Sequence, residues 1–443
     1  MRDFSGYETS GANAASLALL EQAFHEMRCF IGDPVATVQR ALEATPELVM
    51  GHVLKAYLHL LGTESAGFPI ARDAHASGAA PPPTDRERRH LEAIGQLLDG
   101  QWRSAGRLLE DLSIEYPLDV LAIQVGHQID FFTGDSRMLR DRIARALPAW
   151  GRSIPGYHAL LSMHAFGLEE TGDYCHAEAQ GRASLEFEPR DGWGQHAVAH
   201  VMEMQRRRRD GIAWMRATAN VWSHESFFAV HNWWHLALFH LAVDEVGEAL
   251  ALFDGPIYGK RSTVVLEMID ASALLWRLQL RGVEVGDRWH AVADNWEPIA
   301  AAGNYAFNDM HAMMAFVGAG RQNAAQAVLQ AQREAMESQC DNAGFTREVG
   351  HAAACAILAF GAGDYAQAVR LLRPIRSYAH RFGGSHAQRD VIDLTLIEAA
   401  RQSGQERLAD ALRAERASAK SETPFAPLQR LVAERRSAML GVA

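Results

Sequence analysis

Apolar side chains recur at intervals of three and four residues along most of this 443-residue chain, a spacing that places them on one face of an α-helix. The strict alternation expected of a half-buried strand is scarce. Short segments centred on glycine interrupt the helical pattern, most clearly at GQWRSAGRLLEDLSIEYP (100–117), TGDYCHAEA (171–179), GRQNAAQAVLQ (320–330) and AGDYAQAVR (362–370). The pattern predicts an all-α fold made of antiparallel helix pairs joined by short turns.

The glycine-centred turns are similar to one another, and internal similarity of this kind is typical of a helical solenoid. A tetratricopeptide repeat is about 34 residues long and has small residues at positions 8 and 20. With Gly172 at position 15, those two positions hold Ala165 and Ala177, and the next two repeats place Ala199 and Ala237 at position 8. The fit of three consecutive repeats predicts a tetratricopeptide-like solenoid that winds as a right-handed superhelix.

We expect one solenoid domain over residues 1–443. The repeat pattern fits best over 156–260, helical pairs over 1–150 are irregular, and further repeats occupy 261–443. The segment PPPT at 81–84 is interpreted as a connection between two helices. Because a solenoid of this length curls, its concave side is expected to form a groove or to enclose a central pocket.

Composition and charge exclude several classes of protein. Hydrophobic residues make up 48% of the chain and charged residues 22%, as in a globular domain. The formal net charge of −11 argues against a nucleic-acid-binding surface, and the basic run RRRR at 206–209 is interpreted as a turn between helices. No stretch approaches the ~18 consecutive apolar residues of a membrane span. The four cysteines form no CxxC pair and the amino-terminal segment has no signal-type apolar region, so we expect a cytoplasmic protein.

The segment HNWWHLALFH at 231–240 concentrates three histidines and two tryptophans in about three turns of helix. In the repeat register, one side of each first helix packs against neighbouring helices and the other faces the concave surface. Trp233 falls on the packing side. The concave side holds His196, His200, Glu203, His231, Trp234 and His235. The four histidines form two pairs spaced by four residues, so each pair projects from one side of its helix.

Histidine and tryptophan are unusual on a surface that only needs to be soluble, where charged and small polar residues dominate. Nine of the twenty histidines lie between His158 and His240. The pattern therefore favours a functional groove. The alternative is that these are structural histidines whose hydrogen bonds are satisfied within a packed core, and the sequence leaves that alternative open.

Several segments of the chain are distinctive enough to suggest a family. They are FGLEETGDY (166–174), HAVAHVMEM (196–204), HNWWHLALFHL (231–241), DASALLWRLQLRG (270–282), FNDMHAMMA (307–315) and GGSHAQRDV (383–391). Together they resemble the tetratricopeptide repeat protein 38 family, and the resemblance spans most of the chain. It implies the same helical repeat fold. Some bacterial relatives in that family are encoded with glycopeptide-antibiotic pathways, where an enzymatic role has been suspected, but a fold does not by itself establish a function.

The resemblance also indicates which parts of the carboxyl-terminal half are specialised. Asp270 and Arg277 reach the concave side of one first helix, and Asp309 and His311 lie near the start of another. The segment GGSH at 383–386 opens a further helix, and a helix N-terminus favours anions. The candidates from this half are Asp270, Arg277, Asp309, His311, His386 and Arg389.

Histidines, carboxylates and arginines in one groove can carry out acid–base chemistry on a small polar molecule, because the pKa of histidine lies near neutrality. Arginine binds carboxylates and phosphates with paired hydrogen bonds, so the expected ligand is anionic. The predicted catalytic residues are His200, His235, Glu203, Asp309 and His311. The predicted substrate-binding residues are His196, His231, Trp234, Asp270, Arg277, His386 and Arg389. The sequence thus predicts a small-molecule enzyme and leaves the reaction and the substrate open.

The sequence leaves the cofactor open. The GxSxG, P-loop and GxGxxG signatures are missing, so nothing supports a nucleotide or nicotinamide. The HxxxH pairs His196/His200 and His231/His235 have a spacing that can hold one or two metal ions together with a carboxylate. That spacing is also common by chance, and HExxH is missing, so no residue is assigned as a metal ligand.

The competing prediction is a non-enzymatic scaffold that binds a peptide or protein partner in its groove. Tetratricopeptide grooves of that kind usually grip a terminal carboxylate with lysine and asparagine, whereas this chain has three lysines, none of them in the distinctive segments. A pocket of small-molecule size favours the enzyme, and an open channel favours the scaffold. The apolar spacing of FAPLQRLVAERRSAML (425–440) indicates a capping helix or a contact in a homodimer.

Overall fold

The computed structural model describes residues 1–420, and it is helical throughout that range. The only strand-type pairings among these residues are two isolated bridges, Arg2 with Glu8 and Ile31 with Ser226. Consecutive helices pack in pairs, so the predicted all-α solenoid is confirmed. The described helices include none that is both long and apolar enough to cross a membrane. The predicted capping or dimer helix at 425–440 lies outside the described residues.

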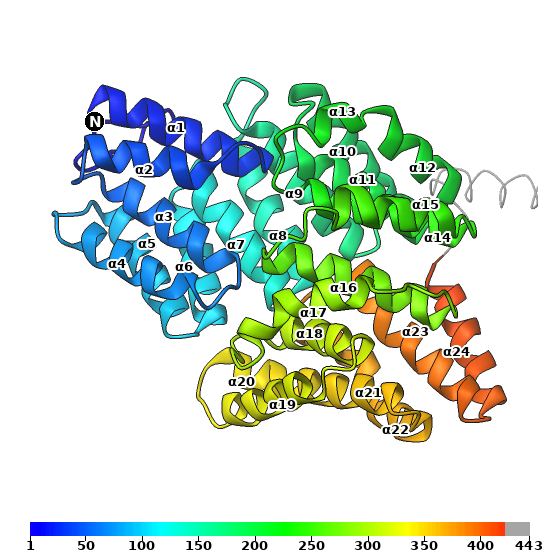
Figure 1. Cartoon of the computed structure of the whole chain (residues 1–443). Coiled ribbons are helices and arrows are strands. Elements are labelled where there is room, and N and C mark those ends of the chain that lie inside the picture. The colour runs from blue at the N-terminus through cyan, green and yellow to red at the C-terminus, as the bar shows by residue number, and fades with distance from the viewer. Residues whose placement is uncertain (421–443) are drawn as a thin grey trace, which may run out of the picture.

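The helices follow one another with short connections (Figure 1). Those of the first half are α1 (Ala14–Cys29), α2 (Pro34–Ala44), α3 (Val49–Leu61), α4 (Gly67–Ala79), α5 (Asp85–Leu98), α6 (Trp102–Glu115), α7 (Val120–Phe132), α8 (Ser136–Ala146), η1 (Leu147–Ala149), α9 (Tyr157–Glu170), α10 (Tyr174–Phe187), α11 (Gly192–Met204), α12 (Arg208–Ala217) and α13 (Ala219–Trp222). Those of the second half are α14 (Ala229–Ala242), α15 (Val246–Leu252), η2 (Phe253–Ile257), α16 (Val265–Leu280), α17 (Arg288–Trp296), η3 (Glu297–Ile299), α18 (Ala306–Gly318), α19 (Gln322–Met336), α20 (Asp341–Phe345), η4 (Thr346–Gly350), α21 (His351–Gly361), α22 (Tyr365–Ile375), η5 (Arg376–Phe382), α23 (His386–Gln402) and α24 (Glu406–Ala419).

The structure has turns between helices at the glycine-centred segments, as the sequence predicted. The segment 171–179 turns between α9 and α10, where Gly172 adopts a left-handed φ of 86° and Asp173 caps α10 through its side chain. The segment 362–370 connects α21 to α22 in the same way, with Asp364 as the capping residue. Glycine tolerates the left-handed conformation and a capping aspartate satisfies a free N–H of the helix, which explains why this pair of residues recurs at the turns.

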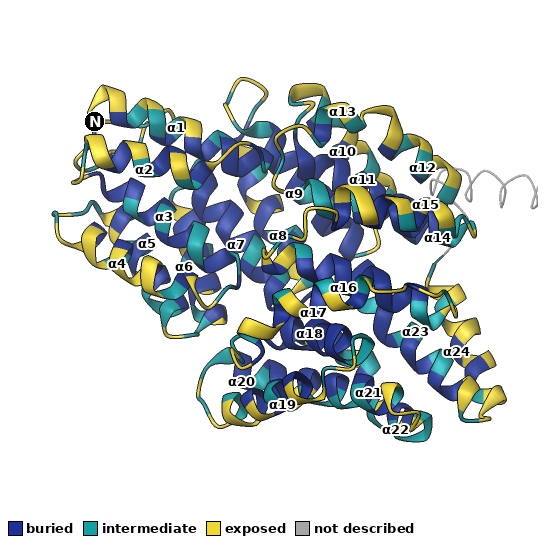
Figure 2. Ribbon diagram, viewed as in Figure 1, coloured by how far each residue is buried: buried dark blue, intermediate teal, exposed yellow. Residues whose placement is uncertain are grey.

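The helices form two layers that differ in burial (Figure 2). The first helices of successive repeats, α9, α11, α14, α16 and α18, pack against one another as an inner layer. Of the 13 residues of α11, 12 are buried, whereas α10 in the outer layer buries only 3 of its 14 residues. A helix that is buried all round is covered on every side. The inner layer is therefore the core of the molecule, and polar residues on it are far from bulk water.

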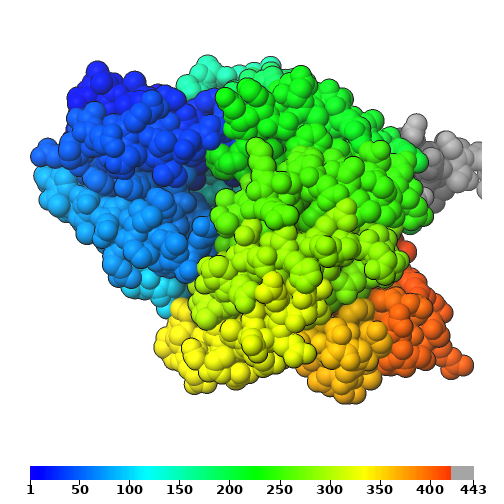
Figure 3. Space-filling view, viewed as in Figure 1, coloured from blue at the N-terminus to red at the C-terminus, as the bar shows by residue number. Residues whose placement is uncertain are grey.

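The solenoid curls until its two halves meet (Figure 3). The hydroxyl of Tyr305 donates a hydrogen bond of 2.9 Å to the carbonyl oxygen of Phe132 at the end of α7. Nearby, Gly134 has a φ of 71° and lies so close to the backbone of η5 that a Cβ atom on it would be 1.7 Å from the carbonyl oxygen of His380. The turn between α7 and α8 thus touches the carboxyl-terminal repeats, and the concave side is largely enclosed.

This closure bears on the two forms predicted for the concave side, an open groove or an enclosed pocket. Trp234 was predicted on that side, and its side chain is completely buried. Trp233, expected on the packing side, is half-buried and its ring lies 4.5 Å from that of Trp222. Residues of the N-terminal half lie against the inner layer, where Asn308 of α18 donates to the carbonyl oxygen of Thr63 and His127 of α7 packs against Trp193 of α11. We call the buried region around the inner helices the interior.

Candidate functional site

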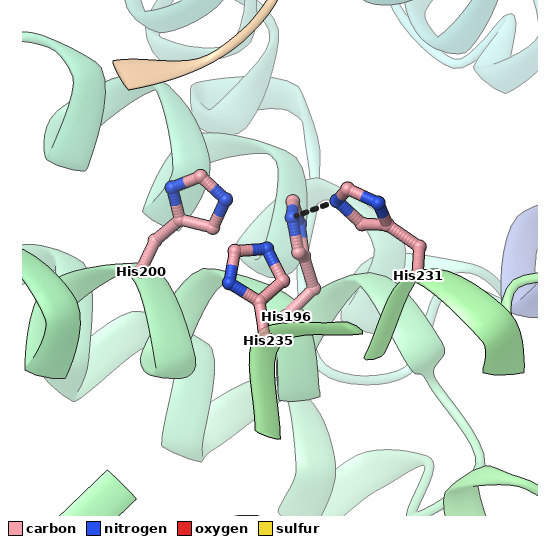
Figure 4. A group of neighbouring side chains, drawn as sticks. All are labelled: His196, His200, His231 and His235. Atoms are coloured by element: carbon pink, nitrogen blue, oxygen red, sulfur yellow. Dashed lines mark hydrogen bonds between the residues drawn. The ribbon is translucent and has the colours of Figure 1, made fainter. Parts of the chain in front are cut away.

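Four histidines from two neighbouring inner helices form one cluster in the interior (Figure 4). We call His196 and His200 of α11 and His231 and His235 of α14 the histidine cluster. The ring centroids of His196 and His200 are 4.3 Å apart, and those of His200 and His235 are 4.5 Å apart. One nitrogen from each of the four rings lies within 4.8 Å of the other three. The structure therefore brings both predicted pairs into a single group.

The cluster is buried and most of its nitrogens have no hydrogen-bond partner. His196, His200 and His235 are fully enclosed, and only His231 has an exposed edge. The one hydrogen bond within the cluster joins Nε2 of His231 to Nε2 of His196 at 3.1 Å. The unpartnered nitrogens are Nδ1 of His196 and both ring nitrogens of His200 and His235. Each buried polar group left without a partner costs about 1–3 kcal/mol, so the cluster lowers the stability of the fold unless a bound group satisfies its nitrogens.

Burial also fixes the charge of these side chains. It lowers the pKa of His196 and of His235 well below the ordinary value, and the neighbouring histidines of the cluster add to the effect. Both rings are therefore neutral at pH 7, with a free lone pair on one nitrogen.

Asp270 of α16 orients the exposed member of the cluster. Its two carboxylate oxygens lie 2.9 and 3.0 Å from Nδ1 of His231, and the aspartate itself is buried. An ionised carboxylate only accepts hydrogen bonds, so Nδ1 of His231 carries the proton and donates it. The lone pair of His231 is then on Nε2, which faces His196. The predicted substrate-binding residue Asp270 thus acts on His231 and fixes its tautomer.

The carboxylate nearest to His200 is Glu169 of α9, which the sequence pattern did not single out. Its Oε2 lies 3.4 Å from Nδ1 of His200, and both of its oxygens are buried without a hydrogen-bond partner. The predicted partner Glu203 instead accepts a hydrogen bond of 2.9 Å from Nζ of Lys420. Lys420 outweighs the effect of burial and lowers the pKa of Glu203. Glu203 is therefore paired with a lysine 217 residues away in the chain, and its role beside His200 stays a prediction.

Trp234 and Arg277 cover one side of the cluster. The indole of Trp234 stacks on His231 with ring centroids 5.3 Å apart, and the guanidinium carbon of Arg277 lies 5.2 Å from the centroid of the indole ring. Arg277 donates to backbone carbonyls, including that of Ala387 at 2.7 Å. Among residues 1–420 it forms no direct ion pair, although the charges of Asp390, Glu203 and Asp270 act on it. Burial lowers its pKa to about 10, so it remains a cation at pH 7. A buried guanidinium without a carboxylate partner is suited to bind an anion.

His386 and Arg389 at the start of α23 already hold an anion from the protein itself. The backbone N–H of His386 donates to Oε1 of Glu170 at 2.8 Å, and Nη2 of Arg389 lies 3.2 Å from Oε2 of the same residue. The predicted anion site at this helix N-terminus is therefore occupied by Glu170, the last residue of α9. Oxygens of Glu169 and Glu170 and a nitrogen of His200 lie within 4.8 Å of one another, which links α23 to the histidine cluster.

A cavity of about 560 Å³ opens beside this start of α23. We call it the α23 cavity. One wall is the turn 134–137 between α7 and α8, and Met204 of α11 forms part of another. Its charged and titratable lining includes Arg376, His386, Arg389, Asp390, Arg416 and Lys420. Volumes of about 300–1,000 Å³ are typical of small-molecule sites.

Asp309 and His311 do not join the cluster. They are two residues apart on α18, so they point about 200° apart around the helix. Asp309 lines a smaller cavity of about 70 Å³ with Asn308 and Thr63, and burial raises its pKa to about 7. Nδ1 of His311 donates to the carbonyl of Phe307 at 2.8 Å. Within the described residues, neither Asp309 nor His311 forms a hydrogen bond or a ring contact with a histidine of the cluster. The geometry therefore does not support one catalytic centre that contains these two residues and the cluster.

A separate group of polar side chains lies between α1 and α9. Sγ of Cys29 is 3.8 Å from Nδ1 of His25 and 3.9 Å from Nε2 of His158. Asp191 accepts from Nδ1 of His158 at 2.9 Å. Burial raises the pKa of the Cys29 thiol, which keeps it protonated and unreactive. No short motif could have revealed this group, because its members come from distant parts of the chain.

A comparison with protein-family models finds no match for this chain. What the site does must therefore be argued from its own geometry and chemistry.

Proposed function

We propose that the protein is an enzyme that transforms a small, anionic molecule in the interior, with the histidine cluster as its reactive centre. The observation that carries the proposal is the concentration of buried and unpartnered polar atoms there. Five histidine nitrogens and the carboxylate of Glu169 have no hydrogen-bond partner among the described residues. Such an arrangement costs stability and is typical of sites where a ligand or a reaction uses those groups.

Two further observations support an anionic substrate. Arg277 is a buried cation beside Trp234 with no carboxylate partner among residues 1–420, and its charge acts on the nearby rings of His235 and His311. The α23 cavity has the volume of a small-molecule site, and its lining holds five arginine or lysine side chains against four carboxylates. We propose that a substrate enters through the α23 cavity, and that its anionic group is held by Arg277 while Trp234 forms an apolar wall.

In this proposal His200 and His235 are the groups closest to the reaction, with Glu169 in the role that the sequence pattern gave to Glu203. Glu169 is adjacent to His200, whereas Glu203 is held by Lys420. Asp270 orients His231. We do not assign catalytic roles to Asp309 and His311, because their contacts lie elsewhere.

The enzyme is favoured over the peptide-binding scaffold by the burial of the concave side. A scaffold needs an exposed groove along several repeats, but α11 and α14 are covered on their inward faces. The α23 cavity also suits a small molecule better than an extended peptide. We further propose that the chain is related to the tetratricopeptide repeat protein 38 family and works in the cytoplasm, in keeping with its free cysteines.

The test is to incubate the purified protein with an extract of polar metabolites and to follow all anionic species by mass spectrometry. The expected result is the loss of one anionic species and the gain of a product with the wild-type protein, and neither change with His235→Gln. A matched control is His127→Gln, because His127 is equally buried and unpartnered but lies outside the cluster. Turnover that persists in His235→Gln would contradict the proposal.

A further inference from the structure

The histidine cluster has the composition of a metal site as well as that of an acid–base centre. Its four rings each offer a nitrogen, and the chosen nitrogens all lie within 4.8 Å of one another. In a tetrahedral site with metal–nitrogen bonds of about 2.1 Å, two ligand nitrogens are about 3.4 Å apart. The 3.1 Å between the Nε2 atoms of His196 and His231 is close to that spacing. Small rotations of side chains would therefore complete a four-nitrogen site.

We propose that His196, His200, His231 and His235 together bind one divalent transition-metal ion of the zinc type. The proposal rests on the proposed function, because it names the chemistry that the reactive centre would use. Imidazole nitrogen is a preferred ligand of zinc, copper, nickel and iron, whereas calcium and magnesium prefer oxygen. A metal ion would also provide a partner for one unpartnered nitrogen of His200 and one of His235.

The residues around the cluster fit this role. Metal-binding histidines commonly donate their other N–H to a carboxylate, and His231 donates Nδ1–H to Asp270 in this way. Its Nε2 then carries the lone pair, and a bound ion would replace the hydrogen bond between this atom and Nε2 of His196. Glu169 adds a second buried carboxylate beside His200 with no hydrogen-bond partner among the described residues. The ionised carboxylates of Asp270 and Glu169 beside the four imidazoles would balance the charge of one divalent ion.

Nearby charged groups do not compete for this position. Glu170 is already held by Arg389 and by the N-terminus of α23. Arg277 stacks over the indole of Trp234 and donates to backbone carbonyls. An ion held by all four histidines would act as a Lewis acid by accepting a substrate oxygen as a fifth ligand, while Arg277 holds the anionic group of the substrate.

The experiment is to purify the full chain without chelator and to measure bound metals by mass spectrometry. The metal-free protein, prepared with a chelator, is then titrated with Zn²⁺ and Co²⁺. We expect one ion per chain and visible Co²⁺ bands without the thiolate charge-transfer band that Cys29 would give. His196→Gln and His235→Gln should each weaken Zn²⁺ binding at least about 100-fold. His127→Gln, a buried histidine outside the cluster, should bind as the wild type does.

Three outcomes would overturn the inference: no Zn²⁺ binding by the wild-type chain, unchanged binding by His235→Gln, or a thiolate signature with Co²⁺. If the cluster variants do not fold, the Co²⁺ spectrum of the wild-type chain still shows whether the ion is bound without a thiolate ligand. The two proposals also fail separately. Full turnover by metal-free protein would support the proposed enzyme and contradict the proposed metal site. Tight metal binding without turnover of any anionic metabolite would support the metal site and contradict the proposed enzyme.

Discussion

His231 and Asp270 are 39 residues apart on α14 and α16, and both carboxylate oxygens of Asp270 lie within 3.0 Å of Nδ1 of His231. The pair is the only carboxylate–histidine hydrogen bond of the histidine cluster within residues 1–420. Because the aspartate is buried, its charge acts at short range and in a medium of low polarity. It fixes which nitrogen of His231 carries the proton and so decides what the other nitrogen can bind.

Asp270→Asn is therefore expected to impair the site more than the fold. The amide of asparagine can donate an N–H to Nδ1 of His231, where the carboxylate of Asp270 accepts a hydrogen bond. This favours the tautomer of His231 that carries its proton on Nε2. We expect Zn²⁺ affinity to fall about 10–100-fold, which is typical for loss of a carboxylate that orients a metal-binding histidine. Isothermal titration with Zn²⁺ measures the affinity, and denaturant unfolding of the metal-free protein measures stability. Equal Zn²⁺ affinity in the variant and the wild type would show that Asp270 has no such role.

The fold was predictable because its signal is local. Ala165, Ala199 and Ala237 were placed at the small position of three repeats, and all three are fully buried where first helices pack closely. The pairing of histidines was predictable for the same reason, since residues four apart share a helix face. Both inferences need only the geometry of one helix and the repeat of a motif.

The partners of the site residues were not predictable, because they come from distant parts of the chain. Glu203 is three residues from His200, yet Lys420, 217 residues away, holds it. The N-terminus of α23 was expected to bind an anion, and the anion is Glu170, which is 216 residues away. Such contacts depend on how far the solenoid curls, and a single sequence does not give that curvature.

The pH dependence of stability should come in part from buried neutral histidines outside the cluster, in addition to His196 and His235 within it. Burial, with Arg142 nearby, lowers the pKa of His127 to about 3, and burial lowers that of His311 to about 4. Their ordinary pKa is 6.5, so the unfolded chain binds more protons than the folded chain between these values. The stabilising effect is complete above pH 6.5 and is lost as the pH falls towards 4 and 3.

We therefore expect the free energy of unfolding of the metal-free protein to fall by several kcal/mol between pH 7 and pH 4, since each unit of pKa shift corresponds to about 1.4 kcal/mol. Urea unfolding at a series of pH values measures this slope. The double variant His127→Asn/His311→Asn should show a shallower slope than the wild type. Identical slopes would mean that other groups control the acid sensitivity.

Asp309→Asn should raise stability at high pH. Burial raises the pKa of Asp309 from 3.8 to about 7, and one of its oxygens has no hydrogen-bond partner. For a carboxyl group with a raised pKa, the stability present below pH 3.8 is lost as the pH rises through 7. Asparagine has a similar shape and no charge to bury. The gain should be close to zero at pH 4 and reach up to about 4 kcal/mol at pH 8.

Thermal unfolding at pH 4 and pH 8 measures that difference. The same variant tests the predicted catalytic role of Asp309, which the geometry does not support. Unchanged turnover together with higher stability at pH 8 is the expected result. Loss of turnover in a stable protein would restore Asp309 to the active site.

Gly134→Ala should weaken the contact that closes the solenoid. An alanine Cβ would lie 1.7 Å from the carbonyl oxygen of His380, so the backbone of the turn or of η5 must move. Gly172→Ala is a matched control, because Gly172 also has a positive φ but nothing lies within 4 Å of its would-be Cβ. The control should cost about 1–2 kcal/mol for the left-handed conformation alone. We expect Gly134→Ala to cost more than about 3 kcal/mol in denaturant unfolding. Equal costs would show that the two halves are not in close contact there.

Arg277→Met should abolish the binding of anions in the interior while leaving the fold intact. Methionine keeps an apolar side chain against Trp234 but removes the charge. The cost to the fold should be modest, because the hydrogen bonds lost are to backbone carbonyls and no carboxylate among the described residues is left without its partner. Inorganic phosphate and a small dicarboxylate are suitable probes. A ligand that binds only the folded state at 100 times its Kd raises the free energy of unfolding by about 2.7 kcal/mol, so the wild-type melting temperature should rise with either probe.

Arg376→Met is the control, because Arg376 lines the α23 cavity but is paired with Asp393 and Glu415. If Arg277 holds the anion, the response to the probes disappears in Arg277→Met and persists in Arg376→Met. The reverse pattern would place the anion in the α23 cavity, away from the histidine cluster, and would separate the substrate site from the proposed reactive centre.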